Sequence, residues 1–305
     1  MKMKTIKILA AIVTHNRKDL LARCIDHINN QSRMPDSIVV IDNGSTDDTQ
    51  ATLEERGVRS IKQDNLGSAG GWKRCIQVAL DEDFDAVWLM DDDGFPDVDA
   101  LRILEENLSP GISAVSSVVL NENDNNKFVF PFPVLDKNLS PVLFSFKRKI
   151  RKLDKLKKIS NRNSFPFAHF FNGALIPISS IDSIGAINDM YFIAGEEVDY
   201  FNRLSSIGEV RSILSAFHYH PDVSKRSWSK LKFYYFIKNT IILNRKQYRF
   251  FLVRDISTIV IALSRIASRN GLSSFFSYLI GKDCRIFYNA IYRGLLGKIG
   301  KDFNG

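Results

Sequence analysis

Three consecutive aspartates, Asp91, Asp92 and Asp93, follow directly after the apolar run VWLM. Adjacent carboxylates at the mouth of a buried strand repel one another, which disfavours their ionisation unless a cation neutralises them. Oxygen ligands of this kind favour Mg²⁺ or Mn²⁺, and such an ion would hold a diphosphate through its remaining coordination positions. The alternative is an acidic turn that caps a helix beginning near residues 97–100. The position of the acids at the end of a strand favours the metal site.

Two further polar strings follow apolar runs. Thr14 and Arg17 belong to VTHNR after the first run, and Asp42 and Asn43 begin DNGSTD after the second. Hydroxyl and amide groups can hydrogen-bond a base or a ribose, and a guanidinium suits a phosphate or a base edge. Each string alone is equally compatible with a helix cap or a turn. They become candidates for nucleotide contacts in combination with the aspartates.

The string NLGSAGG, residues 65–71, is rich in glycine. Small residues let backbone amides approach a ligand closely, above all at the start of a helix. The string matches neither the GxGxxG fingerprint of dinucleotide-binding proteins nor a P-loop. Taken alone, the string is more typical of a flexible loop.

The elements that position these residues alternate between strand and helix. Apolar runs predict strands over 6–14, 37–45, 58–64 and 85–94. Helical spacing predicts helices over 17–31 and 47–56, and a loop followed by a helix over 68–83. This alternation predicts an α/β fold with a mostly parallel sheet flanked by helices. In such sheets ligands bind beyond the carboxyl ends of the strands, which is where the polar strings fall.

The rest of the chain divides further. Residues 121–165 combine a polar turn, a proline-interrupted run and a densely basic stretch, and we expect an insertion or flap there. A strand–loop–helix unit is predicted over 171–208, and the signals are helical from about residue 224 onward. We therefore expect a catalytic domain over 1–223 and a helical, basic C-terminal region over 224–305.

Composition and charge narrow the class of protein. The 305 residues are 45% hydrophobic and 25% charged, as in a globular protein with one large domain and a smaller appendage. From Lys225 onward 16 basic residues face three acidic ones, whereas the remainder is net acidic. Nucleic acid, anionic lipid and phosphate-bearing substrates are the partners that such a tail suits.

The cysteines and the apolar runs indicate the cellular compartment in which the protein is expected. The three cysteines are far apart, which predicts neither a disulfide framework nor a zinc site and fits a reducing compartment. The N-terminal apolar run lacks a cleavage site and is predicted to be a strand rather than a signal peptide. No run reaches the ~20 apolar residues that span a bilayer.

Taken in order, VTHNR, DNGSTD, NLGSAGGW and DDDG resemble the motifs of the family 2 inverting glycosyltransferases, which have the GT-A fold. The combination of NLGSAGG with WLMDDDG is most similar to the galactofuranosyltransferases and related rhamnosyltransferases of bacterial polysaccharide assembly. The resemblance covers residues 5–245 and implies a Rossmann-like domain that binds a nucleotide sugar.

The resemblance implies roles for the polar strings. The residues that would bind the base and ribose are Thr14, Arg17, Asp42 and Asn43. Asp91 and Asp93 would be the metal-binding ends of the DxD motif, and Asp92 would lie nearer the donor sugar.

Two later strings complete the implied site. Within GEEVDY, Glu197 matches the catalytic base that takes the proton from the acceptor hydroxyl, with Glu in place of the commoner Asp. Asp199 would orient the helix that follows and contact acceptor hydroxyls, whereas Glu196 is expected to be an ordinary acidic residue of a first helical turn. In FHYHP, His220 matches the metal-binding imidazole better than His218, although strand alternation points both side chains the same way.

Other matches carry no assigned chemistry. YYFIKN, residues 234–239, and YRGLLGK, residues 292–298, resemble strings of the same family. Trp72 and Trp228 are candidates for stacking on sugar faces, with core packing as the alternative.

We therefore expect a single displacement that depends on Mn²⁺ or Mg²⁺, with UDP-galactofuranose as the donor or, as second choice, dTDP-rhamnose. The basic tail and the Lys/Arg-rich residues 147–162 predict a lipid-linked glycan acceptor and an anionic membrane surface, at the inner face of the cytoplasmic membrane. An ordinary solvated surface is the alternative for these charges.

Two rival classes fit less well. A nucleotidyltransferase would carry a glycine-rich phosphate loop after the first strand, which VTHNRKD lacks. A nucleic-acid-binding module would leave Asp91–Asp93 and Glu197 unexplained, so no nucleic acid partner is expected.

Overall fold

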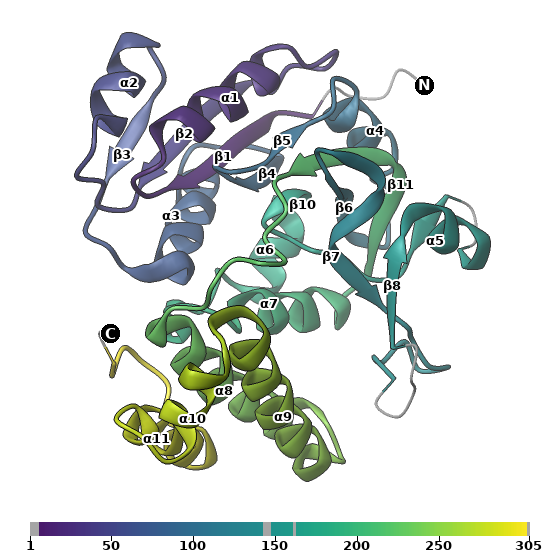
Figure 1. The fold of residues 1–305 in the computed structure, drawn as a ribbon. Helices are drawn as coiled ribbons and strands as arrows, with labels where there is room; N and C mark the ends of the chain where they lie inside the picture. Colours follow the sequence, from purple (N-terminus) through teal and green to yellow (C-terminus); the bar gives the residue numbers. More distant parts are fainter. Residues whose placement is uncertain (1–5, 143–147, 161–162, 304–305) are drawn as a thin grey trace. The chain divides into compact units, whose positions relative to one another are not determined.

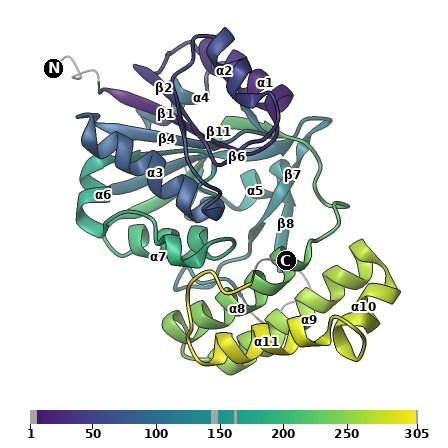
Figure 2. The ribbon, with the colours of Figure 1, turned by 90° about the vertical axis from the view of Figure 1, so that its left-hand side faces the viewer.

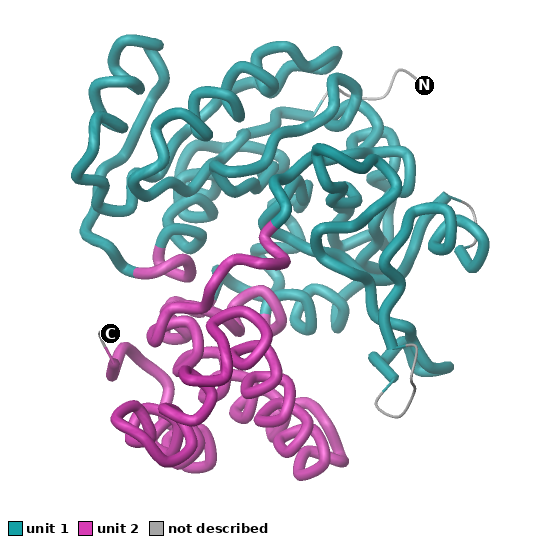
Figure 3. Tube along the Cα trace, viewed as in Figure 1, with its two compact units in different colours: residues 1–66, 71–187, 200–222 teal, residues 67–70, 188–199, 223–305 magenta. Residues whose placement is uncertain are grey.

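The computed structural model describes residues 6–142, 148–160 and 163–303. The chain divides into two compact units (Figure 3). Unit 1 comprises residues 1–66, 71–187 and 200–222, and unit 2 comprises residues 67–70, 188–199 and 223–305.

Unit 1 is built on a twisted sheet that begins with four parallel strands (Figure 1). In spatial order they are β3 (Ser60–Lys62), β2 (Ser37–Asp42), β1 (Ile8–Thr14) and β4 (Ala86–Asp91). β1 is buried throughout, as its uninterrupted apolar sequence predicts. The register pairs Thr14 with Asp42 and Val13 with Asp91, so the ends of three strands lie at one edge.

The sheet continues beyond β4 with a change of direction. β10 (Asn172–Pro177) runs antiparallel to both β4 and β6 (Ile112–Asn121). β11 (Glu209–His220) then pairs parallel with β6, and the short β5 (Phe95–Pro96) pairs antiparallel with β11. The predicted α/β class is confirmed, and the sheet is mixed because β10 lies between two parallel groups.

Helices cover both faces of this sheet. α1 (Lys18–Asn29) and α4 (Ala100–Glu106) pack on the face that carries Ile8, Ala10 and Ile12. The opposite face of β1 receives residues 71–81 of α3 (Gly67–Asp81). α2 (Thr49–Glu55) contacts α1, and α6 (Ile178–Ile184) contacts β10.

The described residues between 121 and 165 form a small layer, whose apolar core also includes residues of β6 and β11. The described elements there are β7 (Asp124–Pro133), β8 (Lys149–Lys152), α5 (Leu153–Ile159) and β9 (Ser164–Phe165). Phe128, Phe132 and Leu156 are buried together in that core, while the lysines of α5 are exposed. The predicted basic stretch 147–162 falls partly outside the described residues, at 147 and 161–162.

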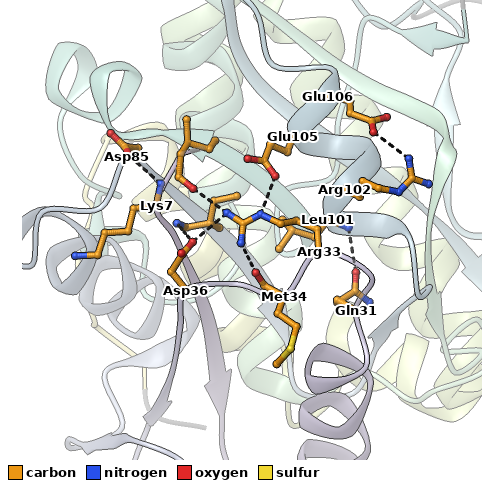
Figure 4. Close-up of polar contacts among 12 residues, drawn as sticks. Lys7, Gln31, Arg33, Met34, Asp36, Asp85, Leu101, Arg102, Glu105 and Glu106 are labelled. Atoms are coloured by element: carbon orange, nitrogen blue, oxygen red, sulfur yellow. Dashed lines mark hydrogen bonds and ion pairs between the residues drawn. The ribbon is translucent and has the colours of Figure 1, made fainter. Parts of the chain in front are cut away.

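A polar network joins the segments around the amino ends of β1 and β4, away from the polar strings (Figure 4). Arg33 bonds the carboxylates of Asp36 (3.0 Å) and Glu105 (2.9 Å) as well as a backbone carbonyl, and Asp85 accepts from the Lys7 amide at 2.7 Å. The partners come from separate segments, so this network fixes how α4 and the strands meet. It is structural in character.

Unit 2 is mainly helical, as predicted for the C-terminal region. Its long helices are α8 (Lys230–Gln247), α9 (Phe251–Asn270), α10 (Leu272–Leu279) and α11 (Cys284–Leu295). α8 packs against α9 and α11 (Figure 2). Lys238 of α8 is fully buried and pairs with Asp302 of the C-terminal segment at 3.0 Å. In the part of the chain that the structure describes, no helix has both the length and the apolar character to cross a membrane.

Candidate functional site

Polar side chains converge at the carboxyl edge of the unit 1 sheet. Arg17 Nη1 donates to Asp92 Oδ1 and to Asp93 Oδ2, both at 2.8 Å. Thr14 Oγ1 donates to Asp92 Oδ2 at 2.7 Å. The structure thus brings the end of β1 and the end of β4 together through side chains, as their neighbouring positions in the sheet predict. The guanidinium of Arg17 thus balances the charge of two of the three aspartates, Asp92 and Asp93.

Burial sets the electrostatics of this cluster. Desolvation raises the pKa of Asp92, which is 3% exposed, and the attraction of Arg17 opposes that rise. Burial in turn lowers the pKa of Arg17, but the charges of Asp92 and Asp93 outweigh it, so the net pKa is raised. Arg17 is therefore held as a cation beside Asp92 and Asp93.

His220 faces Asp93 from β11. Its Nε2 lies 2.9 Å from Asp93 Oδ1, and its Nδ1 lies 2.7 Å from the carbonyl oxygen of Pro221. A carbonyl can only accept, so Nδ1 carries a proton and Nε2 turns toward the carboxylate. Two groups with lone pairs can share one cation at that position, and a histidine whose other nitrogen donates to a carbonyl is the usual arrangement at metal sites. The donor chemistry of Asp93 and His220 therefore fits a divalent ion.

Asp91 is not gathered with that pair into a larger group. Within the described ranges, no set of three or more His, Cys, Asp or Glu side chains could hold a metal ion. Asp91 is the last residue of β4 and is half-buried. Ions such as Mg²⁺ are commonly held by one or two carboxylates together with substrate phosphates, so two protein donors suit an ion that a diphosphate completes.

His218 occupies a different place from His220. It is fully buried, and an ideal Cβ on Gly94 would lie 2.3 Å from its Nε2. Burial lowers the pKa of His218 to about 3, with a further contribution from His220, so the ring is neutral. Gly94, the last residue of DDDG, thus leaves room for this imidazole, and His220 is the histidine that faces Asp93.

The loop after β2 is tied to the loop after β1. Thr46 N donates to Asn16 Oδ1 at 2.7 Å, and Asn16 N donates to Ser45 Oγ at 2.9 Å. Asp42 is fully buried and accepts from Ser45 N at 2.8 Å, while Asn43 is 4% exposed. The predicted nucleotide-contacting residues are thus neighbours, and the side chain of Asp42 is used inside the protein to shape its loop.

A second group of predicted residues lies in unit 2. α7 (Glu196–Ser205) begins with Glu196, Glu197 and Asp199 in its first turn. Glu197 is half-buried, and Asp199 is 2% exposed. Asp199 Oδ1 lies 3.3 Å from Lys246 Nζ and accepts from the Tyr191 hydroxyl at 3.4 Å. Its carboxylate is therefore held inside unit 2, in contact with α8.

Glu196 lies in the first turn of α7, as expected, but it is buried there. It is 5% exposed and accepts a 2.5 Å hydrogen bond from Ser68 Oγ. Burial raises the pKa of Glu196 to about 7, although the Ser68 bond acts in the opposite direction. The sequence does not reveal this burial, because the Ser68 side chain that bonds Glu196 comes from a segment far away in the chain. Only the small size of the residues in NLGSAGG hints at so close an approach.

The glycine-rich string is explained by packing. α3 begins at Gly67, so the flexible-loop alternative is wrong from that residue onward. An ideal Cβ on Gly67 would lie 2.2 Å from the carbonyl oxygen of Phe192, and one on Gly71 would lie 2.6 Å from Val13 Cγ1. Gly67 leaves room for the turn at Phe192 within unit 2, and Gly71 leaves room for β1 within unit 1.

Sequence reasoning missed one basic residue of this region. Arg23 of α1 donates to the Asp93 carbonyl oxygen (3.3 Å) and to Glu122 (2.8 Å), and it lies over the ring of Phe95. It looks like a surface charge of an amphipathic helix, and no spacing in the sequence distinguishes it. Arg23 therefore supports the backbone of the aspartate string.

Both tryptophans singled out in the sequence are core residues. Trp72 is 1% exposed and stacks on Phe171, with ring centroids 4.3 Å apart. Trp228 is 5% exposed and belongs to the core of unit 2. Core packing, the alternative to sugar stacking, is what the structure shows for both.

Known proteins resemble this chain in sequence and in fold. The sequence model of the family described as Glycosyl transferase family 2 matches residues 10–173. Galactofuranosyltransferase GlfT1 of Mycolicibacterium smegmatis is 31% identical over 221 residues, which cover 70% of this chain and 70% of that protein. The O-antigen chain rhamnosyltransferase RfbN of Salmonella typhimurium is 30% identical over 167 residues, 52% of this chain and 51% of that protein.

A solved structure agrees in fold. The mannosyltransferase PcManGT from Pyrobaculum calidifontis, in complex with GDP-Man and Mn²⁺, superposes with a TM-score of 0.56. The superposition covers 97% of this chain and 86% of that one, at 14% sequence identity. At such low identity the likeness concerns the fold alone, which is the GT-A type that the motif order implies.

Proposed function

The chain belongs to glycosyl transferase family 2, and on this premise we propose that it transfers galactofuranose from UDP-galactofuranose to a lipid-linked glycan in bacterial polysaccharide synthesis. Family membership makes it a glycosyltransferase with a nucleotide-sugar donor and a glycan acceptor. The observation that carries the proposal is the approach of Asp93 to both His220 and Arg17 at the carboxyl edge of the sheet. That edge is where α/β folds bind nucleotides.

We assign the donor to this edge. The residues proposed to bind the nucleotide part are Thr14, Arg17, Asp42, Asn43 and Asp92. Because Asp42 and Thr14 are buried and already hydrogen-bonded, they act by fixing the two loops and the Asp92 carboxylate that line the donor site. Arg17 adds a fixed positive charge that attracts a diphosphate.

We assign Asp91, Asp93 and His220 to a bound Mn²⁺ or Mg²⁺. When bound there, such an ion would offset the negative charge of the departing diphosphate. The approach of His220 Nε2 to Asp93 supports this assignment, and Asp91 at the end of β4 is the third residue of the proposed set. The mannosyltransferase of similar fold was solved with Mn²⁺.

We assign the acceptor chemistry to α7. Glu197 takes the proton of the acceptor hydroxyl while that oxygen forms a bond to the anomeric carbon. The bond from the anomeric carbon to the UDP oxygen breaks on the opposite face, and its electron pair leaves with UDP. Asp199 supports Glu197 from the same turn through its contacts with Tyr191 and Lys246.

Different observations support the proposed donor and the proposed acceptor. The 31% identity to a galactofuranosyltransferase over 70% of the chain supports UDP-galactofuranose. The match to a rhamnosyltransferase covers less of the chain and makes dTDP-rhamnose the second candidate. We propose that residues 1–223 carry donor binding and catalysis, and that the basic residues 224–305 contact the lipid-linked acceptor and the anionic cytoplasmic face of the membrane.

A donor panel tests the function. UDP-galactofuranose, UDP-galactopyranose and dTDP-rhamnose are each incubated with Mn²⁺, Mg²⁺ or a chelator, and nucleotide release is measured. We expect UDP release from UDP-galactofuranose with either ion and none with the chelator. Release of dTDP alone would replace the donor, and release of pyrophosphate would indicate a nucleotidyltransferase instead.

Variants test the residues. Asp93→Asn is expected to weaken donor binding and turnover together, whereas Asp81→Asn, at an exposed carboxylate near the end of α3, leaves both unchanged. Glu197→Gln is expected to lower turnover by ~10²–10⁴-fold, the usual scale of general base catalysis, without weakening donor binding. Ordinary turnover of Glu197→Gln would falsify the assignment of the base.

A further inference from the structure

The segment that leads into α7 has an unusual backbone. Phe192 has φ 63° and ψ −65°, and the amide of Ile193 donates to the carbonyl of Tyr191 at 2.7 Å. This is a γ-turn of the rare form with positive φ, which is strained. Ala194 (φ 61°) and Gly195 (φ 113°) follow, also with positive φ. At Phe192 and Ala194 such conformations persist only where surrounding structure holds them, and they gather at functional sites, whereas glycine adopts a positive φ readily.

One side chain of α8 holds this turn. Asn239 is fully buried, and its Nδ2 donates to the carbonyl oxygens of Tyr191 (2.8 Å), Ile193 (3.1 Å) and Ala194 (2.6 Å). Two amide hydrogens serve three acceptors, so one hydrogen is shared. Tyr191 ends a short 3-10 helix, Ile193 and Ala194 follow it in irregular backbone, and the amide donates to all three carbonyls from one position.

The chemistry of the contact selects asparagine. Aspartate would turn a lone pair toward three carbonyls, and leucine would leave all three without this donor. Glutamine would need space for one more methylene, yet an ideal Cβ on Gly195 would already lie 3.0 Å from Asn239 Cβ. The side chain is thus matched to the turn in its donor chemistry and in its length.

The helix that carries Asn239 is a firm support. α8 is capped by the Ser229 side chain, which accepts from Lys232 N at 3.1 Å, and it packs against α9 and α11. From Gly195 the chain continues directly into α7, whose first turn closes with Asp199 N donating to the Gly195 carbonyl at 2.9 Å. The turn therefore fixes where the first residues of α7 lie.

We propose that Asn239 is a positioning residue: by holding the strained turn 191–195, it sets the position of the Glu197 carboxylate for proton transfer. The inference rests on the proposed function, because it takes Glu197 to be the base. It also gives a physical role to the YYFIKN string, whose last residue is Asn239. A base displaced by about 1 Å can cost ~10²-fold in rate, so the effect belongs in kcat.

The first measurement compares two asparagines of the same helix. Asn239→Ala is expected to lower kcat by about 10- to 100-fold with the donor KM changed less than about twofold. Asn244→Ala is the matched control, because Asn244 is also buried on α8 but donates to Asp255 (3.0 Å) and Thr258 (3.3 Å) of α9. The control should lose stability and keep kcat. An equal loss of kcat in both variants overturns the proposal.

The second measurement is a double-mutant cycle with Glu197→Gln. If Asn239 acts through Glu197, Asn239→Ala lowers kcat no further once the carboxylate is gone. If the kcat of the double variant falls by the product of the two single losses, the proposal is overturned. Where Asn239→Ala does not fold, Asn239→Ser, which keeps one donor and leaves a smaller cavity, enters the same cycle with the same two outcomes.

The two hypotheses fail in different ways. If Glu197→Gln keeps ordinary turnover, the proposed base is wrong, and the inference about Asn239 falls with it. If Glu197→Gln is inactive while Asn239→Ala and Asn239→Ser keep their kcat, only the positioning role is wrong.

Discussion

At the scale of single residues, the buried Asp92 at the carboxyl edge of the unit 1 sheet depends on a neighbouring cation. Asp92 has a side chain that is 4% exposed, and Arg17, whose side chain is 32% exposed, is its ion-pair partner there. Burial raises the pKa of Asp92 while Arg17 opposes the rise. The stability of this edge should therefore respond to the loss of one guanidinium.

We predict that Arg17→Met lowers the free energy of unfolding by about 2 kcal/mol at neutral pH, because it leaves the Asp92 charge buried without this partner. The loss is smaller than for a fully buried pair, because Arg17 is partly exposed. Urea unfolding measures it. Adding Asp92→Asn should restore part of the loss, since one of the two carboxylates that Arg17 contacts is then uncharged. Arg102→Met, which breaks exposed ion pairs on α4, is the control and should have only a marginal effect. Equal effects of Arg17→Met and Arg102→Met would contradict the prediction.

Glu196 makes the stability of unit 2 depend on pH. Its pKa is raised from 4.5 to about 7 in the folded chain, so the folded state holds the proton more tightly than the unfolded state. The stabilisation that this proton gives is complete below about pH 4.5 and is lost as the pH rises through about 7. Above that range the ionised, buried carboxylate destabilises the fold.

We predict that Glu196→Gln is about as stable as the wild type at pH 4.5 and more stable by up to ~3 kcal/mol at pH 8. The glutamine can still accept from Ser68 but carries no charge. Thermal and urea unfolding across this pH range measure the difference, with Glu55→Gln at an exposed position of α2 as the control. Identical pH dependence in Glu196→Gln and wild type would show that Glu196 does not titrate in this way.

At the scale of elements, the sequence predicts what local pattern determines. β1, β2 and β4 are continuous apolar runs, and the polar strings at their ends are brought to one edge because parallel neighbours end together. The proposed metal-binding role of Asp91–Asp93 rests on the same pattern, because these acids follow β4 at that edge. The GT-A class, too, was predictable from the order of these strings.

Other features depend on contacts that no local pattern contains. The antiparallel insertion of β10 between β4 and β6 leaves no mark in its apolar sequence. His220 faces Asp93 after a register shift in β11 between Ile213 and Phe217. The burial of Glu196 and the three bonds of Asn239 arise between segments far apart in sequence, so their residue types alone gave no signal.

Gly71 offers a test of element packing. Alanine normally stabilises a helix relative to glycine by about 1 kcal/mol, but a Cβ on Gly71 would lie 2.6 Å from Val13 Cγ1. We therefore predict that Gly71→Ala destabilises the wild-type chain by about 1–3 kcal/mol through overpacking. In a Val13→Ala background the obstacle is gone, and the same change should stabilise by up to ~1 kcal/mol. A double-mutant cycle by urea unfolding measures this change of sign, and additive effects would refute the close contact.

At the scale of the whole molecule, charge and exposed apolar surface coincide in the C-terminal part of the chain. α9 exposes Leu252, Ile256 and Val260, spaced four residues apart on one face, with exposed fractions of 61%, 64% and 56%. Leu272 and Phe276 of α10, and Ile280 directly after that helix, are exposed at the same spacing. An apolar helix face within a strongly basic region is the arrangement that binds an anionic bilayer surface, because apolar burial and electrostatic attraction then act together.

The last prediction concerns that face. Wild-type protein should sediment with anionic liposomes at low salt, and binding should weaken as salt screens a contribution of ~1 kcal/mol per basic residue near the surface. Replacing Ile256 and Val260 together by serine should lower the partition coefficient about tenfold or more, because each buried apolar side chain contributes ~1.5–3 kcal/mol when fully covered. Val98→Ser, at an exposed apolar residue of unit 1, is the matched control and should bind like the wild type. If the wild type fails to bind anionic vesicles at low salt, or the serine variant binds as well as the control, the charges form a solvated surface and the acceptor must reach the enzyme by another route.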